Sequence, residues 1–362
     1  MPQNNFYHQL ARPIVSLAPM DGVTDQPFRH IVQKYGQPDV IYTEFVNVEG
    51  LCHQAERLTR PLLYDSSQQP IVAQIYGKTP KFFRQVAIMV CSLGFAGVDI
   101  NMGCPSKSVA GGGSGAALIK TPKLAQEIIQ AVQQGVEDWV NGVSCEDCSD
   151  LSEEICQIVK SRQAELGLDE NRARQAIPVS VKTRLGITES KIETWLPYLM
   201  EMQPAVISLH GRTLKQSYRG LADWEEIAKA ADMAHQAGIL MFGNGDVQNR
   251  QQAEEYAQKY GVDGVLIGRA VRGNPFVFAK NDPLEDADEQ ERARLLAQVA
   301  LEHAQYYEKC FFNQERRFFL PMRKHLAWYM SGFSYAKEIR KKLVRTNSSE
   351  EVREVFKEYG LL

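Results

Sequence analysis

The chain has 362 residues, 44% of them hydrophobic and 23% charged, which is typical of a globular protein whose core needs no disulfide or metal. The formal net charge is −3, which excludes a global attraction to nucleic acid, so any such affinity must come from a local basic patch. No apolar run is long enough to cross a bilayer, and seven scattered cysteines fit reduced thiols, so we expect a cytoplasmic protein without membrane contact.

Short apolar segments alternate with longer amphipathic stretches along the first three quarters of the chain. Eight such segments are candidate strands, at 14–17, 40–43, 71–75, 98–100, 179–182, 206–209, 239–242 and 264–267. The candidate helices between them include 122–134, 224–236 and 248–260. Two helices are expected to start at Pro80 and Pro122, each preceded by a threonine as N-cap. Eight strand–helix units predict an α/β fold, a (β/α)8 TIM barrel over residues 1–282.

A segment around residues 137–176 departs from this alternation. It begins with an acidic stretch and carries Cys145, Cys148 and Cys156. A structural zinc site uses four ligands, and no second CxxC or histidine pair follows, so we expect no metal there. We interpret the segment as an insertion on the barrel.

The alternation stops after Phe278. Residues 281–291 are polar and acidic and look like a linker, and residues 290–362 are predicted to form an all-helical domain. From residue 309 to 345 ten basic residues outweigh two glutamates, ten minus two giving a local charge of +8. The basic residues are Lys309, Arg316, Arg317, Arg323, Lys324, Lys337, Arg340, Lys341, Lys342 and Arg345. Aromatic residues are interleaved with them, which favours RNA binding over a helical bundle whose cations are merely solvated.

Polar side chains follow almost every predicted strand. In a TIM barrel the loops after the strands form the active face, so these side chains predict a large polar ligand. Gly243, Gly245 and Gly268 let backbone N–H groups converge on a phosphate, and Arg269 adds a bidentate donor. Lys182 and His210 are placed to stabilise negative charge on a flavin ring. The alternative for these two is a lysine–acid pair and a hydrogen-bonded histidine within the barrel.

Cys104 stands in the segment Asn101–Lys107, directly after the fourth strand. An ordinary thiol has a pKa near ~8.5, so Cys104 can donate a proton at neutral pH, although a close Lys107 would favour the thiolate. The alternative is a cysteine that only fills the loop. The pattern Gly111-x-Gly113-x-x-Ala116 formally matches a dinucleotide fingerprint, but it lies too far beyond the strand, and we expect a flexible loop instead.

These segments resemble the tRNA-dihydrouridine synthases, flavoproteins that reduce uridines in tRNA. The resemblance rests on residues 18–25, 74–77, 99–105, 181–184, 210–213, 243–246, 268–270 and 323–329. It implies FMN on the barrel rim, in contact with Pro19, Met20, Asp21, Gln74, Lys182, His210, Asn244, Gly245, Asp246, Gly268 and Arg269. It also implies that Cys104 gives a proton to uracil and that Asn101, Lys107 and Arg184 meet the extruded base or its backbone.

The expected activity is reduction of the C5=C6 bond of uridines in tRNA. Reduced FMN would supply the hydride, NADPH would re-reduce it transiently, and Cys104 would supply the proton. We expect Arg340, Lys341 and Lys342 to bind the tRNA, and no stable protein partner is implied. Two alternatives stay open: an FMN-dependent barrel acting on a free small molecule, and a non-catalytic RNA-binding protein. The basic helical domain argues against the first, and flavin binding would exclude the second.

Overall fold

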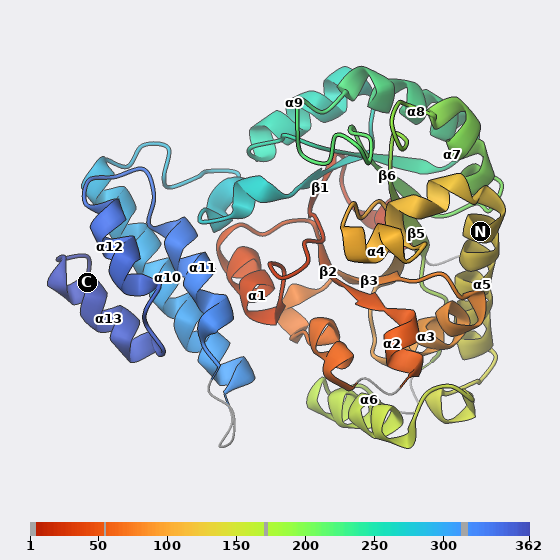
Figure 1. Cartoon of the computed structure of the whole chain (residues 1–362), viewed down its shortest axis with the longest axis horizontal. Helices are drawn as coiled ribbons and strands as arrows, with labels where there is room; N and C mark the ends of the chain where they lie inside the picture. The colour runs from red at the N-terminus through yellow and green to blue at the C-terminus, as the bar shows by residue number, and fades with distance from the viewer. Residues whose placement is uncertain (1–4, 54–55, 170–172, 313–317) are drawn as a thin grey trace.

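Eight parallel strands close into a barrel in the computed structural model, which describes residues 5–53, 56–169, 173–312 and 318–362. The strands are β1 Ile14–Leu17, β2 Val40–Asn47, β3 Ile71–Tyr76, β4 Gly97–Met102, β5 Val179–Arg184, β6 Val206–His210, β7 Leu240–Asn244 and β8 Gly264–Ile267. Each strand pairs with the next, and β8 pairs with β1 to close the barrel. The TIM barrel expected from the sequence is therefore confirmed (Figure 1).

The strands are continuous apolar runs because helices cover one face and the barrel interior the other. All residues of β1, β4, β6, β7 and β8 are buried. A separate cluster fills the end of the barrel where the strands begin, with Tyr7 of η1 (Phe6–Gln9) at its centre. The Tyr7 hydroxyl lies 3.0 Å from that of Tyr42, and its ring meets Phe242 edge-on at 5.7 Å. Packed side chains fill this end of the barrel, and the cavity described below opens at the other end.

Helices follow the strands around the outside of the barrel. The longer ones are α1 Gln26–Tyr35, α3 Pro80–Ser92, α5 Pro122–Val140, α7 Ile192–Met200, α8 Trp224–Gln236 and α9 Arg250–Tyr260. Shorter elements follow β2 and β8, namely α2 Val48–Cys52, η2 Glu56–Leu62, η3 Ser66–Gln68, η6 Arg269–Val271 and η7 Pro275–Phe278. Pro80 and Pro122 do start helices, and Thr79 and Thr121 are their N-cap residues as expected, although neither threonine side chain makes a capping hydrogen bond.

The inserted segment folds onto the outside of the barrel. The end of α5 leads through η5 (Cys145–Asp147) to α6 (Glu153–Glu165), which contacts α3. Its three cysteines are buried in the hydrophobic cluster that surrounds the barrel, and burial raises the pKa of Cys148 to about 12. Among the residues described, no three His, Cys, Asp or Glu side chains gather as ligands for a metal ion.

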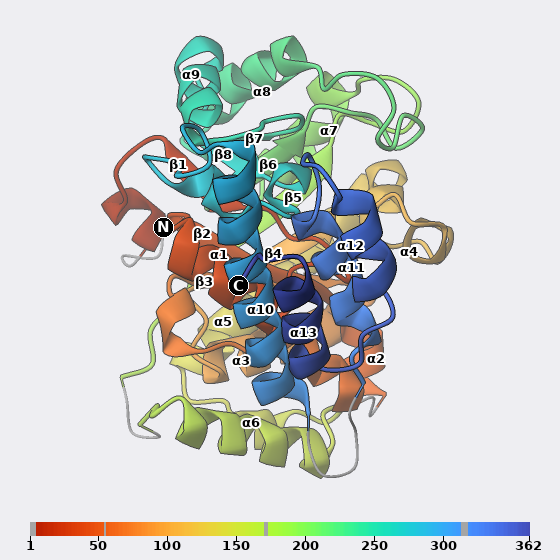
Figure 2. The ribbon, with the colours of Figure 1, turned by 90° about the vertical axis from the view of Figure 1, so that its left-hand side faces the viewer.

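Four helices of the described residues form the C-terminal region beside the barrel (Figures 1 and 2). They are α10 Glu289–Phe311, α11 Leu320–Tyr329, α12 Ala336–Leu343 and α13 Ser349–Glu358. Their hydrophobic cluster also takes in Ile31 of α1 and Phe276 of η7, so it is continuous with the barrel side. Arg316 and Arg317 of the basic stretch lie outside the described residues. Of the helices that the structure describes, none combines the length and apolar character of a membrane span.

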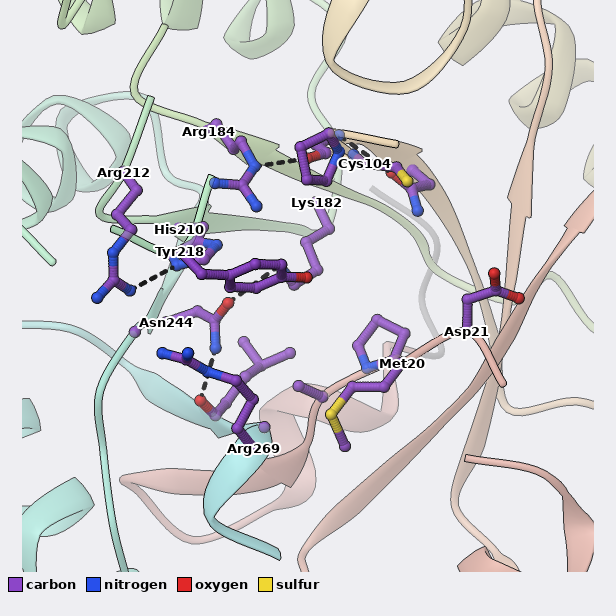
Figure 3. Close-up of a pocket in the computed structure, with 18 of the residues that line it drawn as sticks. Met20, Asp21, Cys104, Lys182, Arg184, His210, Arg212, Tyr218, Asn244 and Arg269 are labelled. Atoms are coloured by element: carbon purple, nitrogen blue, oxygen red, sulfur yellow. Dashed lines mark hydrogen bonds between the residues drawn. The ribbon is translucent and has the colours of Figure 1, made fainter. Parts of the chain in front are cut away.

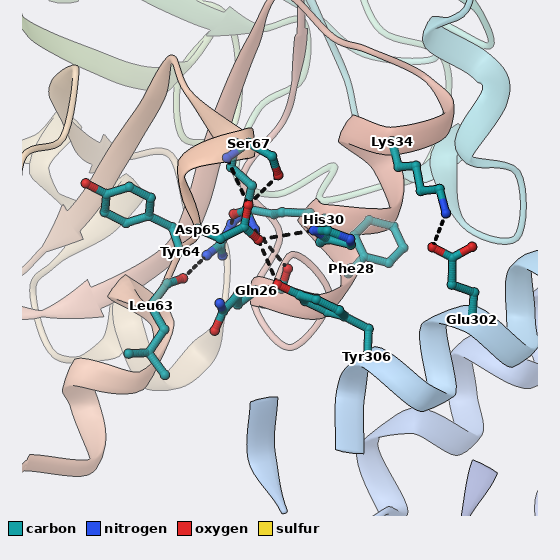
Figure 4. A network of polar contacts seen from close by, with 12 residues as sticks. Gln26, Phe28, His30, Lys34, Leu63, Tyr64, Asp65, Ser67, Glu302 and Tyr306 are labelled. Atoms are coloured by element: carbon teal, nitrogen blue, oxygen red, sulfur yellow. Dashed lines mark hydrogen bonds and ion pairs between the residues drawn. The ribbon is translucent and has the colours of Figure 1, made fainter. Parts of the chain in front are cut away.

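Polar contacts fix α10 against the barrel (Figure 4). The His30 ring stacks on Tyr306 at 3.8 Å, and Asp65 Oδ2 lies 3.1 Å from His30 Nδ1 and accepts from the Tyr306 hydroxyl at 2.9 Å. Glu302 accepts hydrogen bonds from Lys34 Nζ at 2.5 Å and from the Tyr35 hydroxyl at 2.6 Å. Because these partners come from α1, the η2–η3 connection and α10, the interface specifies one orientation of the helical region.

Two buried histidines lie in the same interface. The Phe28 ring packs against His303 at 5.9 Å and His325 at 5.2 Å. Burial lowers the pKa of His303 to about 3 and that of His325 well below its ordinary value, so both rings are neutral.

We expect this interface to make folding pH-dependent. The unfolded chain binds protons on both imidazoles below about pH 6.5, while the folded chain does not, so stability is present above that pH and falls below it. His325→Leu should therefore reduce the loss of unfolding free energy between about pH 7.5 and pH 5.5 by roughly 1 kcal/mol, measured by urea denaturation. His8→Leu, at an exposed position of η1, should leave the loss unchanged. An equal loss in wild type and His325→Leu would contradict this origin.

Candidate active site

A cavity of about 630 Å³ opens where the strands end. All eight strands or the loops after them contribute to its lining, as barrel closure requires. It gathers most of the residues expected from the sequence: Pro19, Met20, Asp21, Gln74, Asn101, Cys104, Lys182, Arg184, His210, Asn244, Gly245, Asp246, Gly268 and Arg269. Figure 3 shows side chains from opposite strands pointing into one space.

Four expected site residues do not line the cavity. Lys107 is exposed at the start of α4 (Lys107–Gly111). On α12, Arg340 donates to the Met330 carbonyl at 2.5 Å, Lys342 forms an ion pair with Glu358, and Lys341 is exposed. The last three therefore have a surface position, and only Lys341 among them lacks a partner within the described chain.

A buried hydrogen-bond network holds the floor of the cavity. Asp99 accepts hydrogen bonds from Gln74 Nε2 and Ser180 Oγ, both at 2.6 Å. Burial raises the pKa of Asp99 to about 6, although these two bonds oppose the shift. Gln74 Oε1 accepts from Asn101 Nδ2 at 3.0 Å. Because Asp99 engages one N–H of Gln74, the orientation of the amide is fixed and its second N–H remains for a ligand.

The Cys104 thiol stands on the rim in a loop that Asn101 shapes. Asn101 Oδ1 accepts from the backbone N–H groups of Gly103 at 3.1 Å and Cys104 at 2.9 Å. Gly115 has φ +59°, and a Cβ there would lie 3.2 Å from the Cys104 Cβ, so its turn closes tightly behind the thiol. Two short helical turns, α4 and η4 (Gly115–Lys120), follow the thiol, and residues 112–114 between them form a turn.

Burial raises the pKa of Cys104 above its ordinary value. Lys182 and Arg184 oppose this shift only in part, while Asp21 adds to it. The exposed Lys107 is not among the main groups that shift the pKa of the thiol, so the close approach that would favour the thiolate is not seen. Cys104 is therefore protonated at neutral pH.

Lys182 is the cation at the centre of the cavity. Its Nζ donates to Asn244 Oδ1 at 3.1 Å, and Asn244 Nδ2 donates to the Leu266 carbonyl at 2.9 Å. Burial lowers the pKa of Lys182 to about 8, with a further contribution from Arg184 and an opposing one from Asp99. The ammonium group is thus mostly charged at neutral pH and keeps donor capacity for a ligand.

Arg184 ties two loops of the rim together. Its Nε donates to the Gly103 carbonyl at 2.6 Å, and its Nη1 donates to the Ser217 carbonyl at 3.1 Å. Burial lowers the pKa of Arg184 to about 10, so the guanidinium remains charged. The loop that carries Cys104 is thereby joined to the loop after β6.

Arg212, which the sequence reasoning did not assign to the site, joins the loops after β6 and β7. Its Nη2 donates to both Asp246 oxygens, at 2.7 and 2.6 Å, and its Nη1 donates to His210 Nε2 at 3.2 Å. His210 accepts this bond and is neutral, because burial and the nearby cations lower its pKa well below the ordinary value. Arg269 Nη2 also donates to Asp246, at 3.2 Å. The motif His210-Gly211-Arg212 was the available signal for Arg212.

Tyr218 and Arg272 also line the cavity and were missed, since no motif marks them. The Tyr218 ring is 54% exposed and lies across the opening, with the guanidinium carbons of Arg269 at 5.1 Å and Arg184 at 5.9 Å. Five cationic and two acidic side chains line the cavity, five minus two leaving +3. An anionic ligand therefore suits this opening although the whole chain is acidic.

Comparison with known proteins identifies relatives over nearly the whole chain. The family described as dihydrouridine synthase matches residues 16–165 and 150–359. A protein of Bacillus subtilis named probable tRNA-dihydrouridine synthase 2 is 36% identical, over 98% of this chain and 96% of its own. Proteins of Staphylococcus epidermidis and Staphylococcus aureus named probable tRNA-dihydrouridine synthase are each 35% identical, over 98% and 99% of this chain and 96% of their own. The chain therefore belongs to the dihydrouridine synthase family.

Proposed function

We propose that the protein is an FMN-dependent tRNA-dihydrouridine synthase that uses NADPH as its reductant and acts in the cytoplasm. The observation that carries the proposal is the cationic cavity whose lining contains a protonated thiol, Cys104, and an ammonium group, Lys182. Its family makes it a flavin-dependent oxidoreductase, and its relatives are named for tRNA. The barrel, residues 1–282, would bind the cofactor and residues 290–362 the tRNA.

The residues present fit a flavin mononucleotide. A volume of about 630 Å³ lies within the usual range of small-molecule sites, roughly 300–1,000 Å³. Pro19 and Met20 offer an apolar wall for the ring, and the free N–H of Gln74 and the Lys182 ammonium suit its polar edge. When bound, the flavin supplies the hydride for the reduction.

Glycines and cations on the opposite side suit the phosphate. Gly245, Gly268 and Arg269 would bind it, with Asn244 and His210 beside the rest of the cofactor. Asp246 would act differently, because a carboxylate repels phosphate and its oxygens already accept hydrogen bonds from Arg212 and Arg269. We infer that Asp246 positions these guanidinium groups, and that Asp21 borders the ring.

Cys104 would complete the reduction by giving its proton to C5 of the uracil. The base would be oriented by Asn101 and Arg184, which line the same opening. The raised pKa of Cys104 keeps the proton on sulfur at neutral pH, and Lys182 and Arg184 would stabilise the thiolate after transfer. Lys107, exposed outside the cavity, would touch only the RNA backbone.

A uridine in folded tRNA must leave its stack to reach this cavity, at a cost of about a few kcal/mol. Phosphate contacts to the helical region would offset that cost. The exposed cations Lys337 and Lys341 on α12, and Arg345 just after this helix, are best placed. Arg340 and Lys342 already have partners and would contribute as part of the same basic surface.

Removing the Cys104 thiol should slow the reduction of uridine without affecting flavin binding. We expect Cys104→Ala to bind flavin normally while slowing oxidation of the reduced flavin by tRNA about 10²- to 10⁴-fold, the usual contribution of a general acid. Stopped-flow absorbance and a dihydrouridine count measure both properties. Cys310→Ala, at another half-buried cysteine, is the control and should resemble wild type. Wild-type turnover by Cys104→Ala would contradict the assignment.

Lys182 should tune the flavin electrostatically. A cation near the ring stabilises the anionic reduced form, so Lys182→Met should lower the midpoint potential by about 30 mV for each ~1.4 kcal/mol of stabilisation lost. Lys182→Arg keeps the charge and should shift the potential less. An anaerobic reductive titration with a reference dye measures it, and identical potentials in wild type and Lys182→Met would refute the contact.

Basic residues of α12 should govern the salt dependence of tRNA binding. Replacing both Lys337 and Lys341 with Gln should reduce the slope of log Kd against log salt by roughly 1.5, from two lost phosphate contacts. The matched control replaces Lys229 and Lys259, exposed on α8 and α9 of the barrel, with Gln. If the control lowers the slope as much as the α12 pair, this helix is not the contact surface.

A further inference from the structure

Arg272 lies on the cavity wall at the border with the helical region. It follows η6 at the end of β8, and its guanidinium carbon lies 5.0 Å from the ring centroid of Trp328 in α11. Trp328 in turn packs against the hydrophobic cluster of the barrel. The side chain of Arg272 is thus supported by an aromatic surface from the other part of the chain.

The backbone next to Arg272 is fixed by the same contact. Gly273 has φ +79°, and a Cβ there would lie 2.2 Å from the Trp328 carbonyl oxygen. Only glycine fits this close approach, since a side chain would collide with backbone. Two contacts therefore fix the position of Arg272 relative to α11: its guanidinium packs over the Trp328 ring, and Gly273 lies against the Trp328 backbone.

Arg272 also differs from the other arginines of the cavity. Arg184 donates to the Gly103 carbonyl, and Arg212 and Arg269 donate to Asp246. Among the described residues, the Arg272 guanidinium has no hydrogen-bond acceptor and no ion pair, and its Nε is buried. Burial lowers the pKa of Arg272 from its ordinary value, as expected for a charge without a counter-ion. A half-buried guanidinium in this state favours an anionic ligand.

We propose that Arg272, supported by Trp328, is a phosphate subsite that binds the backbone of the substrate RNA beside the extruded uridine. This assignment rests on the proposed function. A planar guanidinium binds a phosphate through two parallel hydrogen bonds, which Lys cannot reproduce. Three phosphates could reach this opening, those of the flavin, of the dinucleotide reductant and of the RNA.

The position of Arg272 favours an RNA phosphate over the phosphates of the flavin and of the reductant. The cofactor phosphate already has Arg269 and the glycines of the last two loops available to it. Arg272 faces α11 instead, where Lys324 reaches the Gly22 carbonyl from the same helix. A ligand at this border touches barrel and helical region together, as an RNA strand entering the cavity must do.

Three measurements on Arg272→Gln separate the sources of phosphate. We expect tRNA binding to weaken about tenfold and the slope of log Kd against log salt to fall by roughly 0.7–0.9, as for one lost charge-assisted contact. Flavin content and the rate of anaerobic flavin reduction by NADPH should match wild type. Arg272→Lys should restore the slope but only part of the affinity. Arg84→Gln, which removes an arginine on the outer surface of the barrel, is the charge-matched control and should bind tRNA like wild type.

Specific outcomes would overturn the assignment. Wild-type affinity and slope in Arg272→Gln would exclude an RNA contact. Loss of flavin would assign the subsite to the cofactor, and slow reduction by NADPH would assign it to the reductant. Failure of the wild-type enzyme to form dihydrouridine would instead contradict the proposed function, while the difference in salt slope would still decide the role of Arg272.

Discussion

Closure of the barrel is the constraint on which the site depends. Pairing of β8 with β1 brings the ends of all eight strands to one rim, so residues as distant in sequence as Met20 and Arg269 line one cavity. The opposite end is filled by Tyr7, Tyr42 and Phe242. Because backbone hydrogen bonding is satisfied within the closed sheet, the loops after the strands can carry charged side chains without weakening the core.

Two carboxylates, one beneath the floor of the cavity and one in its lining, have hydrogen-bond or ion-pair partners. Asp99 is buried with hydrogen bonds from Gln74 and Ser180, and Asp246 holds Arg212 and Arg269. Each pairing offsets part of the cost of removing a charge from water and fixes a donor for a ligand. Burial raises the pKa of Cys104 and lowers the pKa of Lys182, so one cavity contains both an acid and a cation.

The helical region contributes to the site through its contact with the barrel. The ring of Trp328 supports Arg272, while the stacked pair His30–Tyr306 and the Lys34–Glu302 ion pair fix α10 on α1. These contacts share one interface, so the orientation of the helices and the shape of the cavity border are coupled. A cavity that accepts a nucleotide of a folded RNA needs such a border, because the rest of the polymer must lie outside it.

The sequence alone determined the barrel, because parallel strands buried on both faces read as short apolar runs, and it placed Cys104, Lys182 and Asp246 at strand ends. The sequence could not determine which charged side chains have a hydrogen-bond or ion-pair partner within the folded chain. Lys107 follows Cys104 by three residues, yet its side chain is exposed at the start of α4. Arg340 donates to the Met330 carbonyl and Lys342 pairs with Glu358. Arg212 and Arg272 gain their roles from Asp246 and Trp328. Those partners are remote in sequence, so only the tertiary structure, which brings them within hydrogen-bonding or van der Waals distance, decided these roles.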